Sequence, residues 1–170
     1  TGTWFEHQHT AIKPDVMTLA KGLGSGMPIG ACLARGAAAE LFKPGNHGST
    51  FGGNPLACTA ALTTLQAIED EGLLPNASRI GQFIVDGLKQ AFAGVAGVTQ
   101  VRGHGLMIGI ELDRPCADLV QRALAQGFII NVTSDKVIRL VPPLIMNEQE
   151  ASALIAGVAP LVKEFLAQAA

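Results

Sequence analysis

Residues 19–30 read LAKGLGSGMPIG, a single lysine with four glycines among the nine residues that follow it. The segments on either side, 15–20 and 29–34, are short and apolar, which predicts two buried strands. Lys21 therefore stands at a strand end and before a loop in which a ligand can approach the backbone closely. An ammonium group held in apolar surroundings loses hydration, which favours the neutral amine, a nucleophile toward carbonyl groups. The alternative is an ordinary lysine whose charged end reaches water.

A second glycine-rich loop covers residues 43–53 and reads KPGNHGSTFGG. Asn54 is a favourable N-cap and Pro55 suits the first helical position, which predicts a helix that ends near Glu71. Free N–H groups and the dipole at a helix start favour an anion, although an ordinary strand-to-helix connection is the simpler interpretation of the loop. The residues of this helix expected to be buried are Leu62, Leu65 and Ile68.

Residues 73–75 read Leu-Leu-Pro and are expected to break the regular structure of the chain. The sequence after them has the pattern of a compact α/β module. Pro160 should kink or split the last helix, which starts at Asn147 with a capping-box glutamate at Glu150. The strands expected are 98–101, 106–112, 128–132 and 137–141, with a glycine break at 103–105, and the helices are 80–92, 115–126 and the segment from 147 onward.

Arg139 alternates with valines on the strand expected at residues 137–141. An arginine on an otherwise apolar strand is either paired with a carboxylate of the protein or available to a ligand carboxylate, which its planar guanidinium binds through two hydrogen bonds. The structural ion pair is the default interpretation.

Composition excludes several classes of function. The chain has 170 residues, a net charge of −2 and few aromatic residues, so neither nucleic acid nor an anionic membrane is an expected partner. The longest apolar runs are shorter than the roughly 20 residues of a membrane span. Cys32, Cys58 and Cys116 are expected to be buried, reduced thiols of a cytoplasmic protein. His7 and His9 lack a third ligand at suitable spacing, so no metal site is predicted.

Three segments together resemble the class III pyridoxal-phosphate aminotransferases. They are residues 14–30, which contain the lysine and its glycine loop, residues 45–55, which read GNHGSTFGGNP, and residues 137–144, which read VIRLVPPL. The segments occur in the order that the family shows, and the resemblance covers essentially the whole chain. It implies an α/β fold of the fold-type I transferases. Residues 1–72 would be the C-terminal part of the cofactor-binding large domain, and residues 73–170 would be the small C-terminal domain.

The resemblance also implies roles for individual residues. Lys21 would be the catalytic residue, which binds pyridoxal 5'-phosphate covalently and moves a proton between substrate and cofactor. Thr50 would bind the cofactor phosphate in the neighbouring subunit of a homodimer. Ser49 would contact the acylated amino-acid substrate, and Arg139 would bind a substrate carboxylate or pair with a mobile glutamate. No metal ion is implied.

The activity implied is transfer of the terminal amino group of N-acetylornithine to 2-oxoglutarate, in cytoplasmic arginine or lysine biosynthesis. Ornithine, succinylornithine and 4-aminobutyrate are the alternative donors within the family. The chain opens at Thr1 as though cut from a longer one, and the family's pyridinium-binding aspartate, phosphate loop, ring-stacking aromatic residue and a second substrate-binding arginine are absent from it. The 170 residues alone are therefore expected to be nearly inactive.

The alternative from another class is a non-catalytic α/β module that associates through its apolar surface. A nucleotide-binding domain is excluded, because no glycine loop in the sequence has the strand, G-x-G-x-x-G and helix arrangement that such a domain requires.

Overall fold

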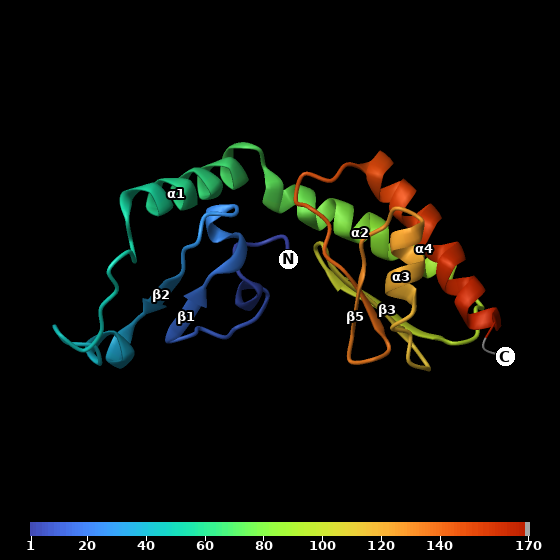
Figure 1. Ribbon diagram of the computed structural model, residues 1–170, viewed down its shortest axis with the longest axis horizontal. Helices are drawn as coiled ribbons and strands as arrows, with labels where there is room; N and C mark the ends of the chain where they lie inside the picture. The colour runs from blue at the N-terminus through green and yellow to red at the C-terminus, as the bar shows by residue number, and fades with distance from the viewer. Residues whose placement is uncertain (169–170) are drawn as a thin grey trace. The chain divides into compact units, whose positions relative to one another are not determined.

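A computed structural model describes residues 1–168 (Figure 1). The chain divides into two compact units. The N-terminal unit is Phe5–Gly72, and the C-terminal unit consists of Thr1–Trp4 together with the chain from Leu73 onward. Both contain helices and strands, so the predicted α/β class is confirmed. No helix within residues 1–168 combines the length and the apolar character needed to cross a membrane.

The N-terminal unit is built on the two strands predicted around the lysine. They pair antiparallel, with Thr18 opposite Cys32, and are slightly shorter than the apolar segments that predicted them. The burial predicted for the two strands is wrong, because no residue of β1 is fully buried and β2 is exposed along its whole length. The long helix α1 packs against the short 3-10 helix η2 that follows the first strand. The elements of this unit are η1 (Glu6–His9), β1 (Val16–Leu19), η2 (Lys21–Gly24), β2 (Ala31–Ala34), η3 (Gly36–Glu40) and α1 (Pro55–Asp70).

Helix α1 begins where its capping residues predict. The Asn54 Oδ1 atom accepts a hydrogen bond from the Ala57 N–H at 3.0 Å, and Pro55 occupies the first helical position. At the other end Gly72, with φ of +61°, takes the left-handed conformation that terminates helices.

The burial predicted for α1 is wrong at two positions. Leu62 is 61% exposed and Leu65 is 37% exposed, whereas Ile68 is half-buried. The buried residues of the helix are instead Ala57 and Ala61. Helix α1 packs closely against η2 through the side that carries its small alanine side chains. The larger side chains of Leu62 and Leu65 lie on the side of the helix that is not covered.

The C-terminal unit is a four-stranded antiparallel sheet in the order β3-β4-β6-β5, covered on one face by helices (Figure 1). Helix α2 packs on β3 and β4 and against α4, while α3 contacts α4 and β5. The elements are α2 (Leu73–Ala91), β3 (Val98–His104), β4 (Met107–Leu112), α3 (Leu119–Ala125), β5 (Asn131–Thr133), β6 (Val137–Leu140) and α4 (Glu148–Gln168).

The core of this unit lies between the sheet and the helices. On β4 the predicted alternation is confirmed, because Ile108, Ile110 and Leu112 are buried while the residues between them are not. Helix α2 contributes Ile80 and Ile84 from the face that its 3.6-residue period predicts. The other face of the sheet consequently carries the polar side chains of the strands.

The sequence predicts that Pro75 and Pro160 interrupt regular structure, but both lie within continuous helices. Pro75 lies in the first turn of α2, where a missing N–H breaks no intrahelical hydrogen bond, so residues 73–75 begin the helix. Helix α4 runs unbroken from Glu148 to Gln168 with Pro160 inside it, so the expected split is wrong. Buried residues on both sides of that proline anchor the helix to the core, which offsets the lost backbone hydrogen bond.

The turn between β3 and β4 falls at residues 105–106, because β3 continues through His104, three residues beyond its predicted end, and β4 begins at Met107. Gly105 has φ of +50°, and a Cβ atom there would lie 2.8 Å from the carbonyl carbon of Thr1. A Cβ atom on Gly81 of α2 would lie 2.0 Å from the Gly105 carbonyl oxygen. These glycines let three backbone segments approach one another more closely than any side chain would permit.

The cysteines differ from the prediction. Cys116 is buried in the C-terminal unit, where burial raises the pKa of its thiol. Cys32 and Cys58 are exposed, so the expectation that all the thiols are buried is wrong for these two. They belong to the N-terminal unit, whose two-stranded sheet has no helical layer comparable to that of the C-terminal unit.

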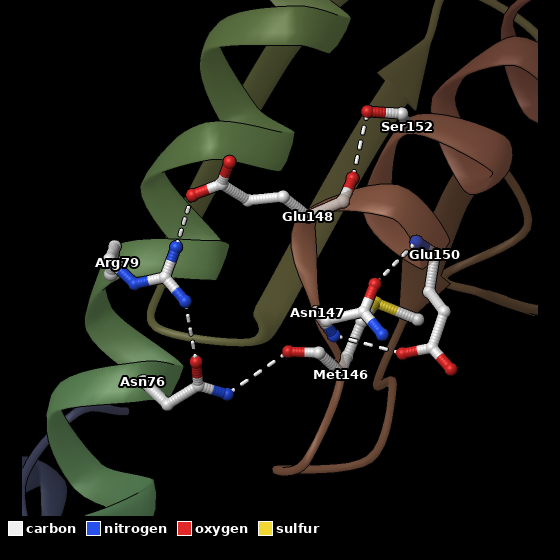
Figure 2. A network of polar contacts seen from close by, with 7 residues as sticks. All are labelled: Asn76, Arg79, Met146, Asn147, Glu148, Glu150 and Ser152. Carbon is white, nitrogen blue, oxygen red and sulfur yellow. Dashed lines mark hydrogen bonds and ion pairs between the residues drawn. The ribbon is translucent and has the colours of Figure 1, made fainter.

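Helix α4 begins with the predicted capping box (Figure 2). The Asn147 N–H donates to Glu150 Oε2 at 2.9 Å, and the Glu150 N–H donates to Asn147 Oδ1 at 2.9 Å. We expect Asn147→Ala to lower the free energy of unfolding by about 1 kcal/mol, measured by urea denaturation. The control is Gln149→Ala, which removes an exposed side chain from the same turn. Equal losses in the two variants would contradict the assigned cap.

Candidate active site

Lys21 stands two residues after Leu19, the last residue of β1, and is the first residue of η2. Its φ is +55°, a left-handed conformation that costs a residue with a side chain roughly 1–2 kcal/mol. Ser25, with φ of +49°, ends the same turn, and a backbone hydrogen bond from the Ser25 N–H to the Gly22 carbonyl closes it at 3.1 Å. Strained backbone of this kind concentrates at functional sites. The strand end and the short turn together hold the Cα atom of Lys21 in one place.

The side chain of Lys21 is exposed and makes no hydrogen bond or ion pair with any residue in the described part of the chain, 1–168. The apolar surroundings expected from the sequence are therefore not supplied by these residues. What the structure does show is a primary amine on a strained backbone with no partner among the described residues to compete with a ligand.

Ser49 and Thr50 are exposed in the loop that precedes α1. Ser49 Oγ accepts a hydrogen bond from the Gly52 N–H at 2.9 Å, and a Cβ atom on residue 52 would lie only 2.7 Å from that oxygen. The serine hydroxyl thus shapes the loop, while its own proton is still available to an acceptor. The Thr50 hydroxyl has no hydrogen-bond partner within residues 1–168, so it is the less committed of the two.

The start of α1 is a weaker anion site than the sequence suggests. Asn54 Oδ1 already accepts from the Ala57 N–H, and Pro55 has no N–H to donate. The Asn54 N–H is directed at the Phe51 carbonyl at 3.4 Å. With these donors used or missing, the Thr50 hydroxyl is a better ligand for an anion than the helix terminus.

Arg139 lies on β6 between Gly109 of β4 and Asn131 of β5. Its side chain is exposed on the sheet face opposite the buried Ile138 and Leu140, and it forms no hydrogen bond or ion pair within the described residues. The ion pair that the default interpretation of Arg139 expects is therefore not formed within residues 1–168. Asn131, its cross-strand neighbour, was not singled out from the sequence, because that relation appears only when the strand order is known.

The other arginine on this sheet face is already paired. Arg102 Nη1 lies 2.8 Å from Glu111 Oε2, and Lys136 Nζ lies 2.9 Å from Glu111 Oε1. The hydrogen bonds from Lys136 and from Arg102 lower the pKa of the Glu111 carboxyl below its ordinary value. Arg139, in contrast, keeps its full set of donors for a ligand carboxylate.

The lowered pKa of Glu111 predicts a pH dependence of stability. A carboxyl whose pKa is lower in the folded than in the unfolded state stabilises the fold above the unfolded value, and this contribution disappears as the pH falls through the folded value. We expect Glu111→Gln to reduce the loss of stability between about pH 7 and pH 2, measured as urea midpoints. Asp118→Asn, which changes an exposed carboxyl that forms no ion pair within residues 1–168, should leave that loss unchanged. The same acid dependence in wild type and Glu111→Gln would contradict the prediction.

The predicted site residues are thus distributed over both units. Lys21, Ser49 and Thr50 belong to the N-terminal unit, and Arg139 belongs to the C-terminal unit. Within residues 1–168 no group of three or more histidine, cysteine, aspartate or glutamate side chains is arranged to hold a metal ion. The uncommitted groups are a primary amine, a hydroxyl and a guanidinium, which suit a carbonyl compound, a phosphate and a carboxylate respectively.

Known proteins resemble the chain over its whole length. Acetylornithine aminotransferase 1 of Bordetella parapertussis is 57% identical over 168 residues, which are 99% of this chain and 43% of that protein. The crystal structure of the ornithine aminotransferase from Toxoplasma gondii ME49 has a TM-score of 0.90 at 31% identity. The match covers 100% of this chain and 41% of the chain in that structure.

A second Toxoplasma gondii ornithine aminotransferase structure, crystallised with oxidised glutathione and described with partial occupancy of pyridoxal phosphate at its active site, has a TM-score of 0.87 at 34% identity. The match covers 95% of this chain and 39% of the chain in that structure. This chain therefore spans less than half the length of the relatives it matches. Residues 1–161 match the family model of the class-III aminotransferases. With the match extending over nearly all of its residues, the chain belongs to the class III aminotransferase family.

Proposed function

We propose that the protein containing this chain transfers the terminal amino group of N-acetylornithine to 2-oxoglutarate. The observation that carries the proposal is Lys21, whose uncommitted amine stands on a left-handed backbone at a strand end, at the position that the resemblance assigns to the cofactor lysine. The choice of donor rests on the acetylornithine aminotransferase of Bordetella parapertussis, at 57% identity.

The residues of this chain fit the cofactor of the family. Class III aminotransferases use pyridoxal 5'-phosphate, which when bound withdraws electrons from the substrate carbon that carries the nitrogen. Lys21 Nζ would bind the aldehyde carbon, and as a free amine it would take and return the proton at the substrate carbon. The Thr50 hydroxyl would donate to the phosphate, in the neighbouring subunit of a homodimer.

Two further residues would select the substrate. Arg139 would bind a carboxylate through paired N–H donors, since no protein carboxylate within residues 1–168 occupies it. The Ser49 hydroxyl accepts from the Gly52 N–H and can still donate its proton to the acyl oxygen of the substrate. An amide-bearing donor suits that hydroxyl better than a second ammonium group would.

The wider assignments belong to the same proposal. Residues 1–72 would complete the large domain of a cytoplasmic fold-type I enzyme, and residues 73–170 would be its small domain. The 170 residues expressed alone are expected to show little or no transamination.

The test compares amino donors on the complete gene product, with 2-oxoglutarate as acceptor. We expect the highest kcat/KM for N-acetylornithine, ahead of succinylornithine, ornithine and 4-aminobutyrate. A visible absorption band with added pyridoxal 5'-phosphate should be present in the wild type and absent in Lys21→Ala. A higher kcat/KM for another donor would refute the substrate assignment. If the wild type shows no absorption band and no transamination, the remaining interpretation is the non-catalytic association module.

A further inference from the structure

Gly109 leaves a gap in the row of side chains that includes Arg139. It lies inside β4, directly opposite Arg102 of β3 on one side and Arg139 of β6 on the other. Residues that pair in this way share a face of the sheet, and neighbouring strands are about 4.8 Å apart. The space above the Gly109 Cα atom therefore lies directly beside the arginine to which a substrate carboxylate is assigned.

The fold of the described residues does not require a glycine at position 109. Its φ lies outside the left-handed region, and the register irregularity of β3 falls at Val98 and Gln100, away from it. A Cβ atom would lie 3.4 Å from Val137 Cγ1 and 3.8 Å from both Cγ and Nε of Arg102, which are ordinary van der Waals contacts. Within residues 1–168 alanine would thus fit without displacing an atom, and it would lose less conformational freedom on folding than glycine does.

Gly103 of the neighbouring strand shows the opposite situation. A Cβ atom there would lie 3.0 Å from Val85 Cγ2 of α2 and 3.1 Å from the Met107 carbonyl oxygen, so the packing of the helix on the sheet requires a glycine. Gly109 lies on the other face, away from the helices. A strand glycine that neither a bulge nor a close contact explains is typical of a place where a ligand approaches the backbone.

The charges around Gly109 favour an anion in this space. Within the four described strands Glu111 is the one acidic residue, whereas Arg102 and Arg139 are both cationic. Glu111 pairs with Arg102 at 2.8 Å and with Lys136 at 2.9 Å, so it is already engaged by two cations. A carboxylate above Gly109 would therefore meet an excess of positive charge, with no methyl group between it and the strand.

We propose that Gly109 is a specificity-determining residue for the carboxylate that Arg139 binds. The carboxylate lies over the Gly109 Cα atom, in the space bordered by the side chains of Arg102 and Val137. A side chain at position 109 enters that space and keeps the carboxylate away from the guanidinium. The inference rests on the proposed function, because Arg139 must bind a substrate carboxylate for the space beside it to matter.

The test uses Gly109→Ala in the complete gene product with pyridoxal 5'-phosphate. We expect KM for 2-oxoglutarate to rise about 10-fold, the effect of weakening one charge-assisted hydrogen bond, with kcat within about 2-fold. The inhibition constant of glutarate, a dicarboxylate without the reacting carbonyl group, should rise by the same factor. The urea midpoint should stay at or above the wild-type value, because the added methyl group fits. The larger side chain of Gly109→Val should raise KM and the inhibition constant further.

The matched control is Gly103→Ala, the same substitution on the helix-covered face. It should lower the urea midpoint and leave KM and the glutarate inhibition constant within about 2-fold of wild type, the reverse of the pattern expected for Gly109→Ala. If Arg139→Ala raises KM while Gly109→Ala leaves both constants unchanged, the inference is overturned and the proposed function stands. A lower urea midpoint for Gly109→Ala with unchanged constants would likewise overturn it, because another segment of the protein would then fill the space. If Arg139→Ala leaves KM unchanged, the carboxylate role of Arg139 fails, and the inference fails with it.

Discussion

We expect transamination by the complete gene product to fall by about 10⁴-fold when Lys21 is replaced by alanine, because the variant loses the group proposed to move the proton at the substrate carbon. It also loses the amine that would hold the cofactor. The fold should persist, since the Lys21 side chain is exposed and makes no hydrogen bond or ion pair within residues 1–168. Steady-state kinetics, the visible spectrum and circular dichroism measure the three effects. Lys13→Ala, an exposed lysine of the same unit, should keep full activity.

A second substitution separates the chemistry of Lys21 from its backbone strain. Lys21→Gly removes the amine as Lys21→Ala does, but glycine adopts φ of +55° without steric cost. The glycine variant should therefore be more stable than the alanine variant by about 1 kcal/mol in urea denaturation, although both are inactive. More than a tenth of wild-type activity in either variant would refute the catalytic role. A glycine variant less stable than the alanine variant would contradict the strained backbone.

Replacing Arg139 by alanine should raise KM for 2-oxoglutarate by roughly 10- to 100-fold, the range for losing charge-assisted hydrogen bonds to a carboxylate. The free energy of unfolding should change by less than about 0.5 kcal/mol, because the side chain is exposed and has no partner among the described residues. Arg139→Lys should recover only part of the affinity, since an ammonium group cannot make the paired contact of a guanidinium.

The control for Arg139 is the paired arginine on the same sheet face. Arg102→Ala removes the contact with Glu111 at 2.8 Å, so its main effect should be on stability and on the acid dependence described above. KM should change little. If Arg102→Ala raised KM as much as Arg139→Ala does, the sheet face as a whole, and not Arg139 in particular, would govern substrate affinity.

Local features of the fold were predicted well because they depend on residues close in the sequence. The positions of the strands around Lys21, though not their burial, were predicted from short apolar segments, and the Asn54 cap and the Asn147–Glu150 capping box each join groups three positions apart. The alternation along β4 depends only on the two-residue period of a strand. The family resemblance was likewise carried by contiguous segments, which explains why it was confirmed over nearly the whole chain.

Predictions failed where the outcome depends on which distant segments pack together. The exposure of Leu62 on α1 and of the thiol of Cys58 reflects what covers the helix, which no local pattern encodes. The order β3-β4-β6-β5 puts Gly109 and Asn131 beside Arg139, and on the same sheet face the Glu111 carboxylate pairs with Arg102 and Lys136, a relation that no local pattern predicts.

The division between the two kinds of information is clearest at Lys21 and at Asn76. The identity of the lysine, its glycine loop and its family could be read from contiguous residues, because the chemistry and the local turn lie within one segment. The hydrogen bonds of Asn76 Nδ2 to the Leu144 and Met146 carbonyls could not, because these partners are 68 and 70 positions away. A hydrogen bond over such a separation exists only after α2 and the loop before α4 have packed on the same sheet, and that packing depends on the burial of the whole core.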